Sequence, residues 1–190
     1  MSQTTVGIVT IQGDFEKHVK SLRALDPGMD IRGLKTPEDL QGVDRVIIPG
    51  GESTTVGMLM QRFGLGDALI ERVRAGMPIW GTCMGLILLA NEIEGHEQYS
   101  LSLLDVTVRR NAFGAQVHSF EDSVDFEGLP EPVLGVYIRA PIITRLGDGV
   151  QALSHYDGKC VAARQGHVIG TSFHPELTDD TRLHAWFLGL

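Results

Sequence analysis

One short segment, Gly81-Thr82-Cys83-Met84-Gly85, constrains the fold of this chain more than any other. It lies between two apolar runs, 77–80 and 86–90, an order that predicts a strand, a sharp turn and a helix. Glycines two residues to either side of a nucleophile relieve the crowding that such a turn imposes. At the start of a helix, unpaired amides and the helix dipole favour the thiolate. We therefore interpret Cys83 as a nucleophile.

A base for this thiol is expected near the other end of the chain. The segment His174-Pro175-Glu176 follows an apolar run, 168–171, that is typical of a strand. In extended chain, residues two apart point to the same side, so His174 and Glu176 are expected to share a face. The carboxylate would then fix the imidazole tautomer while the imidazole acts on the thiol.

Less reactive roles are the alternatives for each of these residues. A lone cysteine in apolar surroundings is usually inert core, and this is our interpretation of Cys160. A histidine before proline is more often structural than catalytic. Six further histidines, His18 and His184 among them, lack comparable neighbours in the sequence.

A third motif, Pro49-Gly50-Gly51-Glu52-Ser53, follows the wholly apolar run 46–48. Such a run predicts a strand of a parallel sheet that is covered on both faces, and ligands bind at the carboxyl edge of these sheets. The glycine spacing matches neither a Walker loop nor a dinucleotide fingerprint, and a plain turn remains the alternative. Its place before the cysteine strand favours an oxyanion hole.

Strands and helices alternate through the first half of the chain, which predicts an α/β fold with an open sheet. From about 104 to 169 the β-rich runs carry many glycines and prolines, so we expect an antiparallel extension and the last strands there. A final helix is predicted from about 179 to 187, with Thr178 as its cap. No repeat or linker interrupts this pattern, and we expect one domain over residues 1–190.

Composition narrows the function further. The 190 residues are 43% hydrophobic and 21% charged, as in a globular domain, and a formal net charge of −8 disfavours binding to nucleic acid. The sequence has neither an apolar run long enough to span a membrane nor the features of a signal peptide. Two cysteines without paired spacing favour neither a disulfide framework nor a zinc site, so we expect a reducing, cytoplasmic location.

Together these motifs resemble those of the class I (triad) glutamine amidotransferases. Within that class, six segments spread along the chain resemble the family of glutaminase subunits of pyridoxal 5′-phosphate synthase. These segments are Ile11-Gln12-Gly13, Pro49-Gly50-Gly51-Glu52-Ser53-Thr54-Thr55, Arg110-Asn111-Ala112-Phe113-Gly114, Ser119-Phe120-Glu121, Ile138-Arg139-Ala140-Pro141 and Phe173-His174-Pro175-Glu176-Leu177-Thr178. One departure is Met84, where this family commonly has alanine.

The resemblance implies a flavodoxin-like fold, an open and mostly parallel sheet flanked by helices. It implies that Cys83 is the nucleophile, His174 the base and later the acid, and Glu176 the orienting carboxylate. Backbone amides of Gly51 and Met84 would form the oxyanion hole. The glutamine pocket would consist of Gly51, Glu52, Ser53, Arg110, Ile138 and Arg139. Arginine suits the carboxylate of a free amino acid, although both arginines fit surface ion pairs equally well.

For function, the resemblance implies hydrolysis of L-glutamine to L-glutamate and ammonia, with neither a cofactor nor a metal. The ammonia would pass to a separate (β/α)₈-barrel synthase subunit within a large hetero-oligomer. We expect the loop around Gln12 and the first helix to contact that subunit. Three alternatives remain: a triad glutaminase that serves another synthase, a stand-alone cysteine hydrolase or deglycase, and a silent subunit that only organises an assembly.

Overall fold

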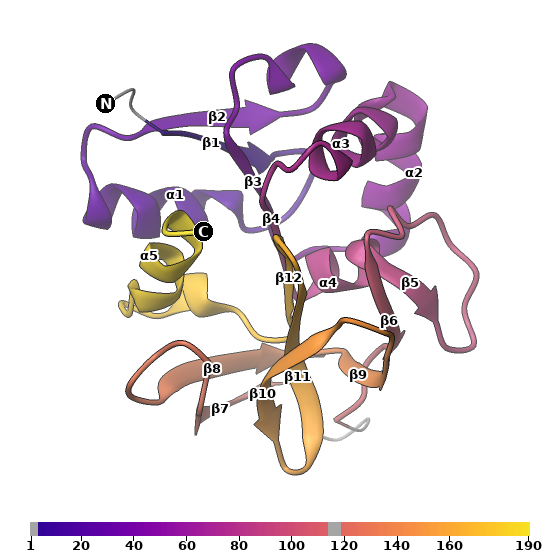
Figure 1. The fold of residues 1–190 in the computed structure, drawn as a ribbon, viewed down its shortest axis with the longest axis vertical. Coiled ribbons are helices and arrows are strands. Elements are labelled where there is room, and N and C mark those ends of the chain that lie inside the picture. Colours follow the sequence, from indigo (N-terminus) through magenta and orange to yellow (C-terminus); the bar gives the residue numbers. More distant parts are fainter. Residues whose placement is uncertain (1–3, 114–118) are drawn as a thin grey trace.

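The computed structural model describes residues 4–113 and 119–190 (Figure 1). Gly114, the last residue of the segment Arg110-Asn111-Ala112-Phe113-Gly114, and the first three residues of the chain therefore lie outside the described part. Within it, ten strands form one sheet in the order β2-β1-β3-β4-β12-β11-β9-β6-β5, with β10 paired to β11.

The first five strands in this order are parallel and form the centre of the α/β fold. They are β2 (Asp30–Leu34), β1 (Thr5–Val9), β3 (Arg45–Ile48), β4 (Ile79–Thr82) and β12 (Val168–Thr171). In β3, Val46 and Ile48 belong to one hydrophobic cluster and Ile47 to the other, as expected for a strand that is covered on both faces. The parallel sheet predicted from the sequence is confirmed.

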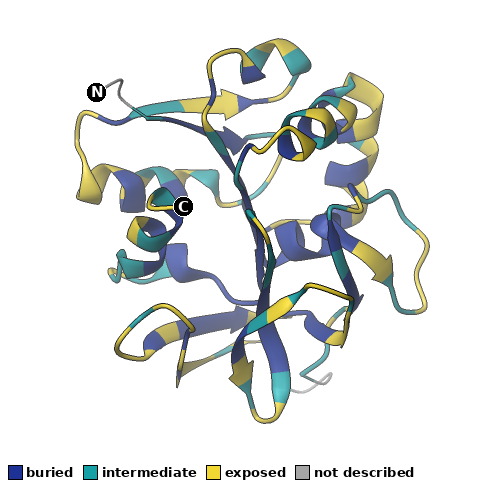
Figure 2. Cartoon of the chain, in the orientation of Figure 1, coloured by how far each residue is buried: buried dark blue, intermediate teal, exposed yellow. Residues whose placement is uncertain are grey.

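Helices cover both faces of these strands. Helices α1 (Phe15–Leu25) and α5 (Arg182–Leu188) lie on one side, and α2 (Ser53–Phe63), α3 (Leu65–Arg74) and α4 (Met84–Leu89) lie on the other (Figure 1). Strands β1, β3, β4 and β12 are almost entirely buried, whereas the edge strand β2 is partly exposed (Figure 2). Two short 3₁₀ helices, η1 (Pro37–Leu40) and η2 (Pro175–Leu177), complete this part of the fold.

The predicted antiparallel extension is also present. It contains β6 (Leu104–Arg109), β9 (Ile142–Leu146), β10 (Gln151–Tyr156) and β11 (Lys159–Gln165), while β7 (Ser119–Val124) and β8 (Val133–Ile138) form a separate pair. Strand β5 (Ala90–Ile93) follows α4 without a loop, and β7 is mostly exposed and polar. Neither strand has the apolar run on which the sequence prediction relied, and both were missed.

The last helix begins later than predicted. Helix α5 starts at Arg182 and its N-cap is Thr181, so the prediction of Thr178 as the cap is wrong. Instead, the Thr178 hydroxyl donates to the Pro175 carbonyl at 3.0 Å, and the Arg182 amide donates to Asp180 Oδ1 at 3.0 Å. These short-range bonds satisfy the backbone in a turn and delay the helix.

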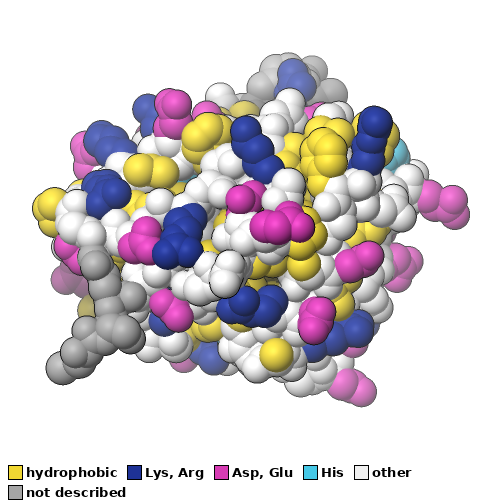
Figure 3. Space-filling model, turned by 90° about the horizontal axis from the view of Figure 1, so that it is seen from above, with side chains coloured by type: hydrophobic (Ala, Val, Ile, Leu, Met, Phe, Trp, Pro, Cys, Tyr) yellow, Lys and Arg dark blue, Asp and Glu magenta, His cyan; other side chains and the backbone are white. Residues whose placement is uncertain are grey.

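The surface carries charges of both signs. On the face seen in Figure 3, lysine and arginine side chains are interspersed with aspartate and glutamate side chains. Among the helices of the described residues, none has both the length and the apolar character that crossing a membrane requires.

Candidate active site

Cys83 occupies a strained turn between β4 and α4. Its φ of 51° and ψ of −102° lie in a region that costs a non-glycine residue about 1–3 kcal/mol. A Cβ at Gly81 would lie 2.4 Å from the Gly85 carbonyl oxygen, and one at Gly85 would lie 2.2 Å from the Ile48 carbonyl oxygen. Both flanking glycines are therefore sterically required, which confirms the turn predicted from the sequence.

His174 and Glu176 form a buried pair. His174 Nδ1 lies 2.7 Å from Glu176 Oε1, and the two residues are only 5% and 3% exposed. The expectation that both residues lie on one extended strand is wrong, because His174 is the N-cap of the 3₁₀ helix η2. This tight turn brings the carboxylate back to the imidazole, while the His174 amide donates to the Val136 carbonyl at 2.8 Å.

The electrostatics of this pair favour two charged side chains. Burial acts to lower the pKa of His174, but interactions with Cys83 and Glu176 outweigh it and raise that pKa to about 10. Burial acts to raise the pKa of Glu176, but His18 and His174 together lower it. At neutral pH His174 is therefore an imidazolium that is paired with the Glu176 carboxylate.

Cys83 and His174 line one cavity of about 340 Å³. Nine of the ten site residues predicted from the sequence line it, and Glu176 is buried next to His174. The lining residues are Asp14, Gly51, Glu52, Ser53, Cys83, Met84, Ile87, Arg110, Asn111, Ile138, Arg139 and His174. The sequence indicated no role for Asp14, Ile87 and Asn111.

Two lining residues besides Cys83 have a positive φ, Asn111 (49°) and Arg139 (46°). Such strained backbone is common where a fold holds a functional site.

Glu52 forms a polar wall of the cavity. Its carboxylate caps α2 by accepting from the amides of Thr54 at 3.0 Å and Thr55 at 2.8 Å. Partial burial acts to raise its pKa, but the hydrogen bonds from these threonines lower it to about 2. Arg110 Nη2 lies 3.7 Å from Glu52 Oε1, so an ionised carboxylate holds the guanidinium at the cavity.

Gln98 holds two residues of the cavity lining, Ser53 and Arg110, by hydrogen bonds. Its Oε1 accepts from the Ser53 hydroxyl at 3.0 Å and from Arg110 Nη1 at 3.4 Å. Ser53 is 2% exposed, so this bond fixes a buried hydroxyl beside the cavity. Gln98 lies in a loop without a recognisable motif, and no sequence signal pointed to it.

The Gly50-Gly51 turn packs closely against both the base and the first loop. A Cβ on Gly50 would lie 2.4 Å from His174 Cε1, and a Cβ on Gly13 would lie 1.8 Å from the Gly50 carbonyl oxygen. The Glu52 amide donates to Gln12 Oε1 at 3.3 Å. The loop after β1 therefore contacts the turn directly.

The second cysteine is in a different environment. Cys160 lies in β11, is 8% exposed, and its thiol donates to the Ala162 carbonyl at 3.4 Å. Burial raises the pKa of this thiol, which keeps it protonated and unreactive. Within the described ranges, histidine, cysteine, aspartate and glutamate side chains form no group of three or more that fits a metal ion.

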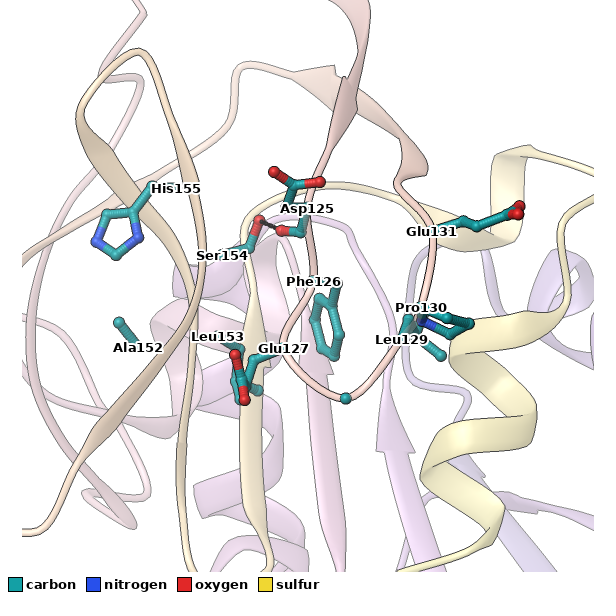
Figure 4. A pocket seen from close by; sticks show the side chains of 11 residues that line it. Asp125, Phe126, Glu127, Leu129, Pro130, Glu131, Ala152, Leu153, Ser154 and His155 are labelled. Atoms are coloured by element: carbon teal, nitrogen blue, oxygen red, sulfur yellow. Dashed lines mark hydrogen bonds between the residues drawn. The ribbon is translucent and has the colours of Figure 1, made fainter.

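A larger hollow, of about 760 Å³, lies between the loop 125–131 and the strand residues 152–155 (Figure 4). The Ser154 hydroxyl donates to the Asp125 carbonyl across it at 2.6 Å. None of the predicted site residues lines this hollow, and it contains no thiol. The smaller cavity, which contains the thiol and His174, is therefore the candidate active site.

Comparison with known proteins agrees with this geometry. The sequence model of the SNO glutamine amidotransferase family matches residues 8–189. The chain belongs to this family. It is a glutamine amidotransferase, a hydrolase of the class that uses a cysteine-histidine-glutamate triad.

Individual relatives align over nearly the whole chain. The pyridoxal 5′-phosphate synthase subunit PdxT of Roseiflexus sp. (strain RS-1) is 52% identical, over 98% of this chain and 100% of the relative. The subunit of the same name from Herpetosiphon aurantiacus is 51% identical over the same shares. A crystal structure described as a glutamine amidotransferase is 46% identical, covers 97% of each chain and superposes with a TM-score of 0.93.

Proposed function

We propose that this amidotransferase is the glutaminase subunit of a pyridoxal 5′-phosphate synthase. It would hydrolyse L-glutamine to L-glutamate and ammonia for a separate synthase subunit. The observation that carries the chemistry is the placement of Cys83, at the apex of a strained turn, in one cavity with the buried His174–Glu176 pair. The PdxT names of relatives that match at about half identity support the biological role.

In the first half of the reaction, the Cys83 sulfur attacks the side-chain amide carbon of glutamine. His174 holds the proton of the thiol and delivers it to the amide nitrogen as the carbon–nitrogen bond breaks. Ammonia leaves, and a γ-glutamyl thioester remains on Cys83. Glu176 keeps Nδ1 of the imidazole occupied, so that Nε2 is the nitrogen that exchanges the proton.

In the second half, water attacks the thioester carbonyl carbon. His174, neutral after the first proton transfer, accepts a proton from this water, and the carbon–sulfur bond then breaks. Glutamate is released, and the proton returns to the Cys83–His174 pair. Two tetrahedral intermediates form, and each carries negative charge on the former amide oxygen.

The backbone amides of Gly51 and Met84 are our candidates for the oxyanion hole. Met84 begins α4 directly after the nucleophile, and Gly51 lines the same cavity, where a Cβ on it would lie 3.3 Å from Met84 Cε. A donor of this kind is worth on the order of 3 kcal/mol in other enzymes. Because each donor is a backbone amide, the methionine side chain at position 84 does not prevent this role.

The cavity walls suit a free amino acid. Arg110 and Arg139 provide positive charge for the α-carboxylate, and the ionised Glu52 provides negative charge for the α-ammonium group. Ser53 and the main chain at Ile138 complete the pocket for the substrate backbone. Its volume of about 340 Å³ is in the range of small-ligand sites.

The synthase subunit would dock at α1 and the loop around Gln12. Gln12 accepts a hydrogen bond from the Glu52 amide, and Gly13 packs on the Gly50 carbonyl. A displacement of this loop would therefore also move the Gly50-Gly51 turn. A partner at this surface would therefore influence the oxyanion hole. We place the complex in the cytoplasm, where both free thiols remain reduced.

The test is ammonia release from L-glutamine by the purified chain, with and without a synthase subunit of the family. We expect release that the synthase stimulates, that Cys83→Ala abolishes and that Cys160→Ala leaves unchanged. Release without any dependence on the synthase would instead indicate a stand-alone amidase. No release under either condition would indicate a silent subunit and contradict the proposal.

A further inference from the structure

Two buried histidines lie behind the triad and have no role in the reaction described so far. His18 in α1 and His184 in α5 are both 0% exposed, and His18 Nδ1 lies 3.0 Å from His184 Nε2. The other nitrogen of His18, Nε2, lies 3.2 Å from Thr82 Oγ1 and 3.5 Å from Glu176 Oε2. Titratable side chains so fully buried require a reason, since each must satisfy its polar atoms without water.

The triad carboxylate has one oxygen that needs a donor. Glu176 Oε1 accepts from His174, but Oε2 is buried and has no hydrogen-bond partner within the described residues. The nearby donor is His18 Nε2, which lies 3.5 Å from Oε2 and 3.2 Å from the Thr82 hydroxyl oxygen. A proton on His18 Nε2 would therefore be shared between the carboxylate and the hydroxyl oxygen.

The protonation states follow from burial and from the pairing of the rings. Burial lowers the pKa of His18 and lowers that of His184 to about 3, so both rings are neutral at pH 7 and each carries one N–H. A proton on His18 Nδ1 would leave a lone pair of Nε2 facing the Glu176 carboxylate, which is repulsive. The proton therefore belongs on His18 Nε2, and His184 Nε2–H donates to His18 Nδ1. His184 Nδ1 is then an acceptor, and it has no partner among the described residues.

We propose that His18 is a positioning residue of the glutaminase, whose Nε2–H holds Glu176 Oε2 and so keeps Glu176 Oε1 on His174 Nδ1. His184 has the further role of fixing the tautomer of His18. The triad thus continues through two more side chains, from Cys83 in the turn after β4 to His184 in α5, which packs against α1 on the same face of the sheet. This inference rests on the proposed function, because it acts through the roles assigned to His174 and Glu176.

Other charged groups near His18 are consistent with this arrangement. On its own helix, Asp14 acts to raise its pKa, and from the segment before η2 the charged His174 acts to lower it. Glu176 has the largest electrostatic effect on His18. Around His184, Asp180 and Glu176 act to raise its pKa, but burial outweighs both. From β4, Trp80 contacts both rings edge-on and is uncharged.

Two substitutions at His18 separate positioning from packing. In His18→Gln, the side-chain amide nitrogen occupies the same branch position as Nε2 and can still donate to Glu176. In His18→Asn, the amide reaches only the position of Nδ1 and loses that donor. We expect His18→Gln to keep kcat within about threefold, and His18→Asn to lose about 10- to 100-fold in kcat with KM little changed.

The pH profile provides a readout that packing alone would not change. Losing the donor to Glu176 raises the pKa of this carboxyl, so the acid limb of kcat/KM should move to higher pH in His18→Asn but not in His18→Gln. A matched control is His167→Gln, because His167 donates to the Val73 carbonyl at 2.6 Å, outside the cavity lining. We expect it to leave kcat unchanged. Equal losses in both His18 variants, or no shift of the acid limb, would overturn the proposal.

A direct measurement needs no turnover. With ¹⁵N-labelled histidine, the ring nitrogen shifts of His18, assigned by their loss in His18→Gln, should show a neutral ring protonated at Nε2 at pH 7. A ring protonated at Nδ1, or an imidazolium, would overturn the proposal. Failure of the proposed function would appear differently, as a wild-type chain without synthase-stimulated ammonia release whatever the tautomer of His18.

Discussion

The contact between Gly50 and His174 gives a sharp prediction about the base. A methyl group at position 50 would lie 2.4 Å from His174 Cε1 and 3.1 Å from Nδ1, whereas ordinary contacts begin at 3.4 Å. The imidazole must therefore move by about 1 Å, the difference between 3.4 and 2.4 Å. Gly50 itself does not have the positive φ that penalises alanine, so the contact with the ring is the main cause of any effect.

The expected magnitude follows from this displacement. A catalytic group misplaced by about 1 Å can lose about 10²-fold in rate, equivalent to about 2.7 kcal/mol of transition-state stabilisation. The same movement lengthens the 2.7 Å bond from His174 Nδ1 to Glu176 Oε1. We therefore expect Gly50→Ala to lower kcat by about two orders of magnitude, with thermal unfolding still cooperative.

The assay is steady-state ammonia release with the synthase subunit present, combined with the rate at which iodoacetamide alkylates Cys83. A matched control is Gly189→Ala, where the added Cβ would lie 3.4 Å from its nearest neighbour, the Trp186 carbonyl oxygen. This variant should keep wild-type activity. If folded Gly50→Ala retained kcat within threefold of the wild type, the placement of His174 against the glycine turn would be refuted.

Three further predictions concern the pair and the pocket. Glu176→Gln should lower kcat in the ammonia assay by about 10³- to 10⁴-fold. The glutamine amide can donate to His174 Nδ1 and so select the wrong tautomer of His174. A loss of less than tenfold would contradict this prediction. Arg110→Met should raise KM for glutamine about tenfold while kcat changes little, and a loss confined to kcat would exclude carboxylate recognition. The pKa of His174 is raised from 6.5 to about 10, so its stabilising contribution is complete below pH 6.5 and is lost as the pH rises through about 10. The difference in free energy of unfolding between the wild type and His174→Gln should therefore shrink over this range in chemical denaturation, and a difference that grows would disprove the assigned shift.

Where a residue type is required by local sterics, the sequence was sufficient to predict the local structure. The glycines around Cys83 are needed for the turn, and the apolar run before Gly50 places the second turn at the same edge of the sheet. The pairing of His174 with Glu176 was correctly expected, but for the wrong reason, because a 3₁₀ turn rather than a strand brings them together.

What the sequence could not provide depends on contacts between distant segments. Gln98 reaches Ser53 from a loop 45 residues away, and His18 meets His184 across 166 residues, so both contacts follow from helix and loop packing. The residues next to His18 and His184 in the sequence form no catalytic motif, so the sequence does not indicate a role for either histidine. Asn111 did carry a signal, since asparagine tolerates the left-handed backbone that it adopts here, but one such residue does not identify a cavity.

The most direct test of the account is to detect the covalent intermediate. The complex with the synthase subunit would be quenched with acid during turnover of L-glutamine, and its peptides would be mapped by mass spectrometry. We predict a γ-glutamyl adduct on the peptide that contains Cys83 and none on the peptide that contains Cys160. Ammonia release at full rate without an adduct on Cys83, or an adduct on Cys160 instead, would contradict the account.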